Sequence, residues 1–226
     1  MKLQDIQGSY DLVVSLGAWC GPALHSKRHD LRRHSLPFDW VQSPNLSEVN
    51  RLLRNGFQGF MELENMVEKD ILAHFVDEGN AVFQEGETEP AKAHFIHDSR
   101  YKIDSVHDFP MIVNQNWTAQ YPLYKEKLNT RIQRFFTQIA QSQSTLFIRY
   151  EWLNANYENT AELQAILSGL TKGKVTILLM EQLEGLKGIR EVEWGLDGVS
   201  LVQVPRQDPS NHEIWDQVLE GITLTK

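Results

Sequence analysis

Short apolar runs that alternate with helical patterns dominate the second half of the chain. Residues 145–150, 174–180 and 199–204 are rich in β-branched and other apolar side chains, and each run has the length of a buried strand. Apolar residues at helical spacing occur at 160–170, between the first two runs, and at 210–222, after the third. Because strands joined by a helix pair in parallel through a right-handed crossover, the pattern predicts a parallel sheet covered by helices.

The first half adds one strand and several helices to this picture. The run DLVVSL at 11–16 has the same β-branched character and predicts a further strand of the sheet. Helical patterns cover 43–56, a looser region at 57–75, and the longest stretch at 118–143. We therefore expect an α/β fold in which a mostly parallel central sheet is flanked by helices in three layers.

Three further segments do not fit the helical pattern. Residues 92–109 alternate short apolar and polar side chains, which predicts two short strands around a turn at 98–100. Residues 35–40 form an irregular segment because Pro37 lacks a backbone donor. The acidic, glycine-containing stretch 80–90 is typical of a mobile surface excursion. No stretch has the length of an interdomain linker, so one domain covering residues 1–226 is expected.

The composition of the chain argues against several classes of function, namely nucleic acid binding, membrane association and metal binding. The chain has 30 acidic and 22 basic residues, a formal charge of −8, which argues against a nucleic acid partner. No apolar run approaches the roughly 18 residues of a membrane span, and the N-terminus has no signal-peptide pattern, so we expect a cytoplasmic protein without a membrane partner. One cysteine and eight histidines without metal-ligand spacing predict no metal and no cofactor.

The single cysteine lies where backbone chemistry could activate it. Cys20 follows the predicted strand at 11–16 and Gly17, and it precedes Pro22, which is tolerated in the first turn of a helix. Unpaired N–H groups at a helix N-terminus favour negative charge, so the thiol is expected to be more acidic than the free value of about 8.5. The alternative is a small buried residue that fills space beneath the helix.

The stretch SLGAWCGPALHSKRHDLRRHSLPFDW resembles the opening signature of a bacterial family of papain-like cysteine peptidases, domain of unknown function 1796. The shared positions are Ser15, Leu16, Gly17, Cys20, Ala23, Leu24, Leu31, Arg32, Ser35, Pro37, Phe38, Asp39 and Trp40. The resemblance continues more loosely to residue 149, through Asp98, Tyr101 and His107-Asp108-Phe109. It implies that Cys20 is the nucleophile of a peptidase-like hydrolase.

The strand pattern and the family label imply different folds. A papain-like peptidase carries its cysteine on a helix and its histidine on an antiparallel sheet, whereas the apolar runs of this chain indicate a parallel sheet. We expect the parallel α/β fold rather than the papain fold. In open α/β sheets, ligands bind beyond the carboxyl ends of the strands, which is where Cys20 would lie.

A cysteine nucleophile needs a base, and His107 is our prediction because it belongs to the segment that resembles the family. Its orienting acid is predicted to be Asp98, with Asp39 as an alternative. The rival base is His212, which begins the last predicted helix just after a strand end. Binding roles are predicted for Ser15, Gly17, Arg32, Asp39 and His212.

Two function classes follow. The first is a cysteine-dependent hydrolase or acyltransferase that acts on a small-molecule or peptide substrate. The second is a non-catalytic α/β module that binds an anionic ligand, a phosphosugar or nucleotide, through the basic tract at 24–35. No glycine-rich phosphate loop supports the second class. The oligomeric state is not predicted by the sequence.

Overall fold

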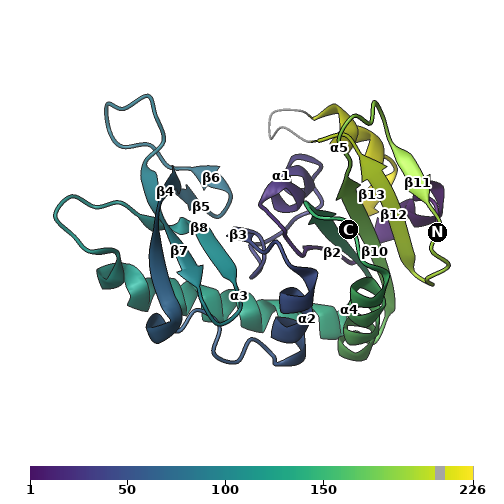
Figure 1. The fold of residues 1–226 in the computed structure, drawn as a ribbon, viewed down its shortest axis with the longest axis horizontal. Helices are drawn as coiled ribbons and strands as arrows, with labels where there is room; N and C mark the ends of the chain where they lie inside the picture. Colours follow the sequence, from purple (N-terminus) through teal and green to yellow (C-terminus); the bar gives the residue numbers. More distant parts are fainter. Residues whose placement is uncertain (207–211, 226) are drawn as a thin grey trace.

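The main sheet has five strands and is mostly parallel. The computed structural model, drawn in Figure 1, describes residues 1–206 and 212–225. The strands of the main sheet, in spatial order, are β11 (Arg190–Val192), β12 (Val199–Val204), β10 (Lys174–Gln182), β9 (Ser144–Glu151) and β2 (Leu12–Ser15). All neighbouring pairs are parallel except β11 with β12. The predicted mostly parallel sheet is therefore confirmed.

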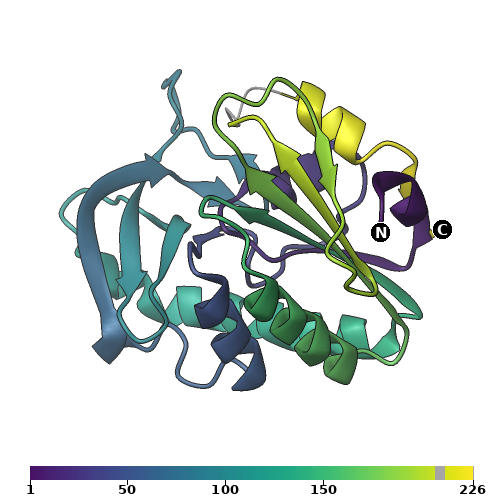
Figure 2. The same ribbon diagram turned by 45° about the vertical axis from the view of Figure 1, so that its right-hand side comes forward.

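Helices cover both faces of this sheet (Figures 1 and 2). One face carries α1 (Gly21–Arg28) and α5 (Glu213–Val218). The other carries α2 (Leu46–Arg54), α3 (Tyr121–Gln141) and α4 (Tyr157–Leu170). Consecutive strand residues point to opposite faces, so alternate apolar residues of β9 and β10 belong to two separate cores. The three-layer arrangement follows from burial of these strands on both sides.

A second sheet lies beside the first and is antiparallel (Figure 1). Its strands, in spatial order, are β3 (Val41–Gln42), β8 (Ile103–Pro110), β7 (Lys92–Asp98) and β4 (Met66–His74). The hairpin formed by β7 and β8 confirms the two strands predicted at 92–109. One hydrophobic cluster includes residues of both sheets, such as Val14 of β2 and Phe109 of β8.

The helical region predicted at 57–75 is wrong, because β4 occupies its second half. The pairing of β4 with β7 shifts register between Lys69 and Leu72, and this irregularity breaks the alternation expected of a strand. Val67, Ile71 and Leu72 of β4 are exposed. The apolar residues of 57–75 therefore have helix-like spacing in the sequence, although they do not form one buried face.

The predicted excursion at 80–90 begins in a hairpin that is docked against other elements. Strands β5 (Val76–Asp77) and β6 (Asn80–Ala81) pair in antiparallel fashion. Lys27 Nζ of α1 donates to the Gly79 carbonyl oxygen at 2.9 Å and to Asn80 Oδ1 at 2.6 Å. The first residues of the excursion are therefore held by α1.

The chain termini pair with each other in a small parallel ribbon. Strand β1 (Gly8–Tyr10), which follows the 3₁₀ helix η1 (Leu3–Ile6), pairs with β13 (Ile222–Leu224). The helix predicted at 210–222 is shorter in the structure, because α5 ends at Val218 and residue 222 lies in β13. Its predicted start at Ser210 falls outside the described residues.

The remaining helices follow their sequence signals closely. A short 3₁₀ turn, η3 (Trp117–Gln120), precedes α3, which has Pro122 in its first turn. Another 3₁₀ turn, η2 (Leu63–Asn65), leads into β4. In the part of the chain that the structure describes, no helix combines the length and apolarity needed to cross a bilayer.

Candidate active site

A cavity of about 390 Å³ lies at the carboxyl edge of the main sheet. Its described lining residues come from successive strand ends: Trp19 after β2, Tyr150 and Trp152 at the end of β9, Gln182 at the end of β10 and Arg206 after β12. This is the edge at which parallel α/β sheets bind ligands. The position follows from the topology, and the lining residues supply aromatic, amide and guanidinium groups.

Cys20 immediately follows the cavity-lining residue Trp19 and precedes the first residue of α1. Its carbonyl oxygen accepts the first helical hydrogen bond, from Leu24 N at 2.9 Å. Burial raises the pKa of the Cys20 thiol to about 11. The expected acidic thiol is therefore wrong for this structure, because loss of solvent raises the pKa of the thiol more than a backbone hydrogen bond lowers it.

The loop that carries Cys20 is held by Arg149 of β9, which is fully buried. Arg149 Nη1 donates to the Leu16 carbonyl oxygen at 2.8 Å and to Ser43 Oγ at 2.9 Å, and Nη2 donates to the Ser43 carbonyl oxygen at 2.6 Å. Its Nε pairs with Glu151 at 2.9 Å. One guanidinium thus joins the end of β2 to the start of the segment that leads into α2.

Ser15 and Gly17 belong to the same support. Ser15 Oγ accepts from Gly17 N at 3.3 Å, and the Gly17 carbonyl oxygen accepts from Tyr150 N at 3.1 Å. Gly17 has φ +82°, a conformation that favours glycine. The structure therefore places both predicted binding residues in the backbone frame of the loop, three to five residues before the thiol.

His107 and Asp98 lie in the antiparallel sheet. His107 Nδ1 donates to the His74 carbonyl oxygen at 2.7 Å, and its ring meets the Trp40 ring edge-on at 6.2 Å. The Asp98 carboxylate accepts from Met61 N at 2.5 Å and from Tyr101 N at 2.8 Å. Among the described residues, no hydrogen bond joins either side chain to the other or to Cys20.

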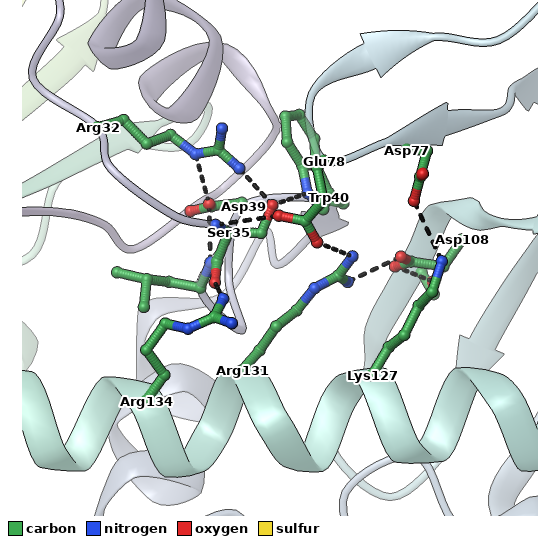
Figure 3. A network of polar contacts seen from close by, with 12 residues as sticks. Arg32, Ser35, Asp39, Trp40, Asp77, Glu78, Asp108, Lys127, Arg131 and Arg134 are labelled. Carbon is green, nitrogen blue, oxygen red and sulfur yellow. Dashed lines mark hydrogen bonds and ion pairs between the residues drawn. The ribbon is translucent and has the colours of Figure 1, made fainter.

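Arg32 forms a buried ion pair with Asp39 of the irregular 35–40 segment (Figure 3). Arg32 Nε lies 2.9 Å from Asp39 Oδ2, which also accepts from Leu36 N at 2.9 Å. Burial raises the pKa of Asp39, and the Arg32 charge opposes that shift. Figure 3 also shows Arg134 of α3, whose Nη1 donates to the Ser35 carbonyl oxygen at 2.9 Å. The pair anchors the segment to its surroundings.

The other cations of the basic tract are also bonded within the chain. Arg28 pairs with Asp216 of α5, and Arg33 donates to the Thr225 carbonyl oxygen at 2.5 Å. Lys27 binds the β5–β6 hairpin, as described above. These three cations and Arg32 are therefore already bonded within the chain, which argues against the anion-binding rim proposed for this tract. Arg206 in the cavity, by contrast, makes no hydrogen bond or ion pair to the described residues.

His212 is brought close to α1 by the packing of α5. Its ring centroid lies 5.3 Å from that of His25, which stacks on Trp215 at 4.4 Å with an interplanar angle of 5°. Burial is the main cause that lowers the pKa of His25, to about 3, so this ring is neutral near pH 7. His212 itself is exposed at the start of α5. The two imidazoles are 187 positions apart, and only the fold joins them.

A family model described as "Putative papain-like cysteine peptidase (DUF1796)" matches residues 11–182. The chain belongs to this family. It is also similar to "Uncharacterized protein R408" of Acanthamoeba polyphaga mimivirus, with 27% identity over 169 residues that cover 74% of each chain. No solved structure matches. The relative is viral, and the bacterial distribution expected for the family stays a prediction.

The family match covers only some of the candidate site residues. It includes Cys20, the aromatic lining residues, Gln182 and His107, whereas Arg206 and His212 lie beyond its last residue. The family's description fits a cysteine hydrolase. Sequence reasoning missed the cavity residues Trp19, Trp152, Gln182 and Arg206. The signal that could have found them is their common position just after predicted strands.

The described residues contain no cluster of three or more His, Cys, Asp or Glu side chains arranged to hold a metal ion.

We expect Gly17→Ala to lower the free energy of unfolding by about 2 kcal/mol more than the control substitution Gly86→Ala does. A Cβ at this position would lie 2.3 Å from Ser43 Oγ, within the Arg149 network. Gly86→Ala is the control, because Gly86 has φ +84° and open space around it. Both variants carry the same backbone strain, so the difference in their urea unfolding free energies isolates the clash. Equal losses would show that the loop adapts.

Proposed function

We propose that the chain is a cysteine-dependent hydrolase or acyltransferase in which Cys20 attacks an acyl group at the carboxyl edge of the main sheet. The observation that carries this proposal is the position of the chain's only cysteine, at the start of α1 and next to a residue that lines the cavity. Backbone N–H groups of the first turn of α1 are the proposed stabilisers of the developing oxyanion. Membership of the cysteine peptidase family supports the same role.

A thiol with a pKa of about 11 is protonated near pH 7 and therefore needs a base during attack. We propose His212 for this role, because α5 holds it beside α1 and its neighbour His25 stays neutral. His107 remains the alternative. Its Nδ1 is bonded to a backbone carbonyl oxygen, and burial lowers its pKa.

The proposed chemistry has two stages, acylation of Cys20 and deacylation. The Cys20 Sγ–carbon bond forms as the S–H proton passes to the imidazole. The bond from the carbonyl carbon to the leaving group then breaks, and the leaving group takes the proton from the imidazole. In deacylation, water or another acceptor attacks the thioester carbon and gives its proton to the imidazole. The carbon–sulfur bond then breaks, and the sulfur takes the proton from the imidazole to restore the thiol.

Acylation by p-nitrophenyl acetate tests this proposal. We expect one acetyl group on the peptide that contains Cys20, detected by mass spectrometry, and no such adduct in Cys20→Ala. His212→Gln should slow the release of p-nitrophenol by about 10²-fold or more, as expected for loss of a general base. His107→Gln is the paired variant, since it removes the alternative base. A slow His107→Gln with a normal His212→Gln would reassign the base.

A second candidate is a binding protein without chemistry at the same edge, and the raised pKa of the Cys20 thiol favours it. This candidate predicts equal rates of ester hydrolysis for the wild type and Cys20→Ala. An acetyl adduct that forms and turns over at Cys20 would exclude it.

A further inference from the structure

Among its described lining residues, the cavity at the carboxyl edge combines aromatic side chains with one arginine, Arg206, that has no hydrogen-bond or ion-pair partner among the described residues. Trp19, Tyr150 and Trp152 supply three of the five described lining residues. The Trp19 and Tyr150 rings meet edge-to-face, with centroids 5.9 Å apart at 66°. Such a wall suits a flat or ring-shaped ligand, because aromatic faces gain most from contact with planar or apolar ring surfaces.

The Trp19 ring packs against Gly21, the first residue of α1. A Cβ on Gly21 would lie 2.4 Å from the Trp19 ring, so the indole packs directly over the glycine backbone. Gly21 has an ordinary backbone conformation, because its φ is not positive. The absence of a side chain at Gly21 therefore makes room for the Trp19 ring. The backbone conformation does not require a glycine at this position.

The described lining of the cavity offers N–H donors from Arg206 and Gln182. Arg206 is exposed and has no hydrogen-bond or ion-pair partner among the described residues. The Gln182 amide oxygen accepts from Tyr150 Oη at 3.2 Å, which leaves the amide N–H groups of Gln182 for a ligand. The described lining contains no acidic residue, although the chain carries a net charge of −8. This local excess of donors selects negative charge.

We propose that this cavity binds a ring-bearing anion, with the ring against Trp19 and Trp152 and a phosphate or carboxylate group at Arg206 and Gln182. The proposal rests on the proposed function in that it names the substrate class of the same site. A planar guanidinium accepts either anion in bidentate fashion, so phosphate and carboxylate share one recognition chemistry here. The cavity volume of about 390 Å³ is within the range of small-molecule sites.

Ligand-observed NMR with a set of small probes separates the contribution of the ring from that of the anionic group. Phenyl phosphate and phenylacetate carry both a ring and an anion, benzyl alcohol carries only the ring, and inorganic phosphate carries only the anion. We expect both ring-bearing anions to bind at least about tenfold more tightly than either half-probe, since ring contact and charge pairing each contribute. The stronger of the two anions identifies the source of the charge, phosphate ester or carboxylate.

Variants locate the binding within the cavity. Arg206→Ala should weaken the better probe by at least about tenfold, and Arg206→Lys should weaken it less, because the charge remains while the bidentate fork is lost. Arg54→Ala is the matched control, an exposed arginine on α2. Gly21→Ala should also weaken the probe, since it displaces the Trp19 ring. Equal affinities in the wild type and Arg206→Ala, or no gain from the ring, would overturn the proposal.

Cys20→Ala keeps this proposal separate from the proposed chemistry. We expect it to bind the ring-bearing anions as the wild type does, because the thiol is not one of the described lining residues. Binding without acetylation of Cys20 would refute the chemistry and leave the anion site standing. Acetylation without Arg206-dependent binding would refute the anion site and leave the chemistry standing.

Discussion

Arg149→Met is expected to lower the free energy of unfolding by about 3–5 kcal/mol, the cost of removing one partner from a buried ion pair. Arg149 is fully buried, and its substitution leaves the Glu151 carboxylate without its cation. It also removes the donors to the carbonyl oxygens of Leu16 and Ser43. Urea denaturation followed by circular dichroism measures the loss. Methionine keeps most of the volume of the arginine's aliphatic stem. The loss of unfolding free energy therefore measures the contribution of the guanidinium group.

Two comparisons make this result specific. Arg54→Met removes an exposed partner of Glu162 and should cost at most about 1 kcal/mol. The double change Arg149→Met with Glu151→Gln removes the uncompensated charge and should recover part of the loss. If Arg149→Met fails to fold, the double variant still measures the network. A loss no larger than that of Arg54→Met would contradict the role assigned to Arg149.

The same network predicts the sign of a pH effect. Burial is the main cause that raises the pKa of Glu151, and the Arg149 charge opposes it. A carboxyl group whose pKa is raised in the folded state favours folding below its unfolded pKa of about 4.3, and this contribution is lost as pH rises through the folded pKa. Without Arg149 the folded pKa should be higher still, so the penalty of Arg149→Met should increase from pH 5 to pH 8.

Much of the main sheet could be predicted because its strands are buried on both faces. The runs at 11–16, 145–150, 174–180 and 199–204 are mostly apolar, and a helix or a longer segment separates each from the next. Their pairing and the location of the ligand edge follow from general rules of α/β folds. The strand β4 could not be predicted in this way, because its bulge and exposed apolar residues remove the period of two.

The candidate site was less accessible to sequence reasoning. The position of Cys20 after a strand could be predicted, but the pKa of its thiol depends on how much protein surrounds it, which no local pattern encodes. The contact between His25 and His212 and the bonds of Arg149 to the loop join residues more than 100 positions apart. Arg32 and Asp39 were predicted as binding residues, yet they hold each other. A single sequence distinguishes poorly between an anchoring charge and a ligand-binding one.

The alkylation of Cys20 by iodoacetamide should be at least about tenfold slower in the native protein than in the urea-unfolded chain at pH 7.5. With a pKa of about 11 the thiolate fraction of the native thiol is on the order of 10⁻⁴ to 10⁻³ at this pH, against roughly a tenth for an unfolded thiol with a pKa of about 8.5. The higher intrinsic nucleophilicity of a more basic thiolate offsets part of this difference. Because the chain has one cysteine, the mass shift reports this site alone.

The pH profile separates a raised pKa from mere steric protection. The native rate should rise about tenfold per pH unit up to about pH 10, whereas the unfolded rate should level off above about 8.5. Cys20→Ser combined with Lys187→Cys provides an exposed thiol in the folded chain as the control for reagent and fold. Steric protection alone would slow the native reaction without moving the midpoint of its profile. A native rate that is already constant at pH 7 would contradict the raised pKa and restore the acidic thiolate expected from the position of Cys20 before α1.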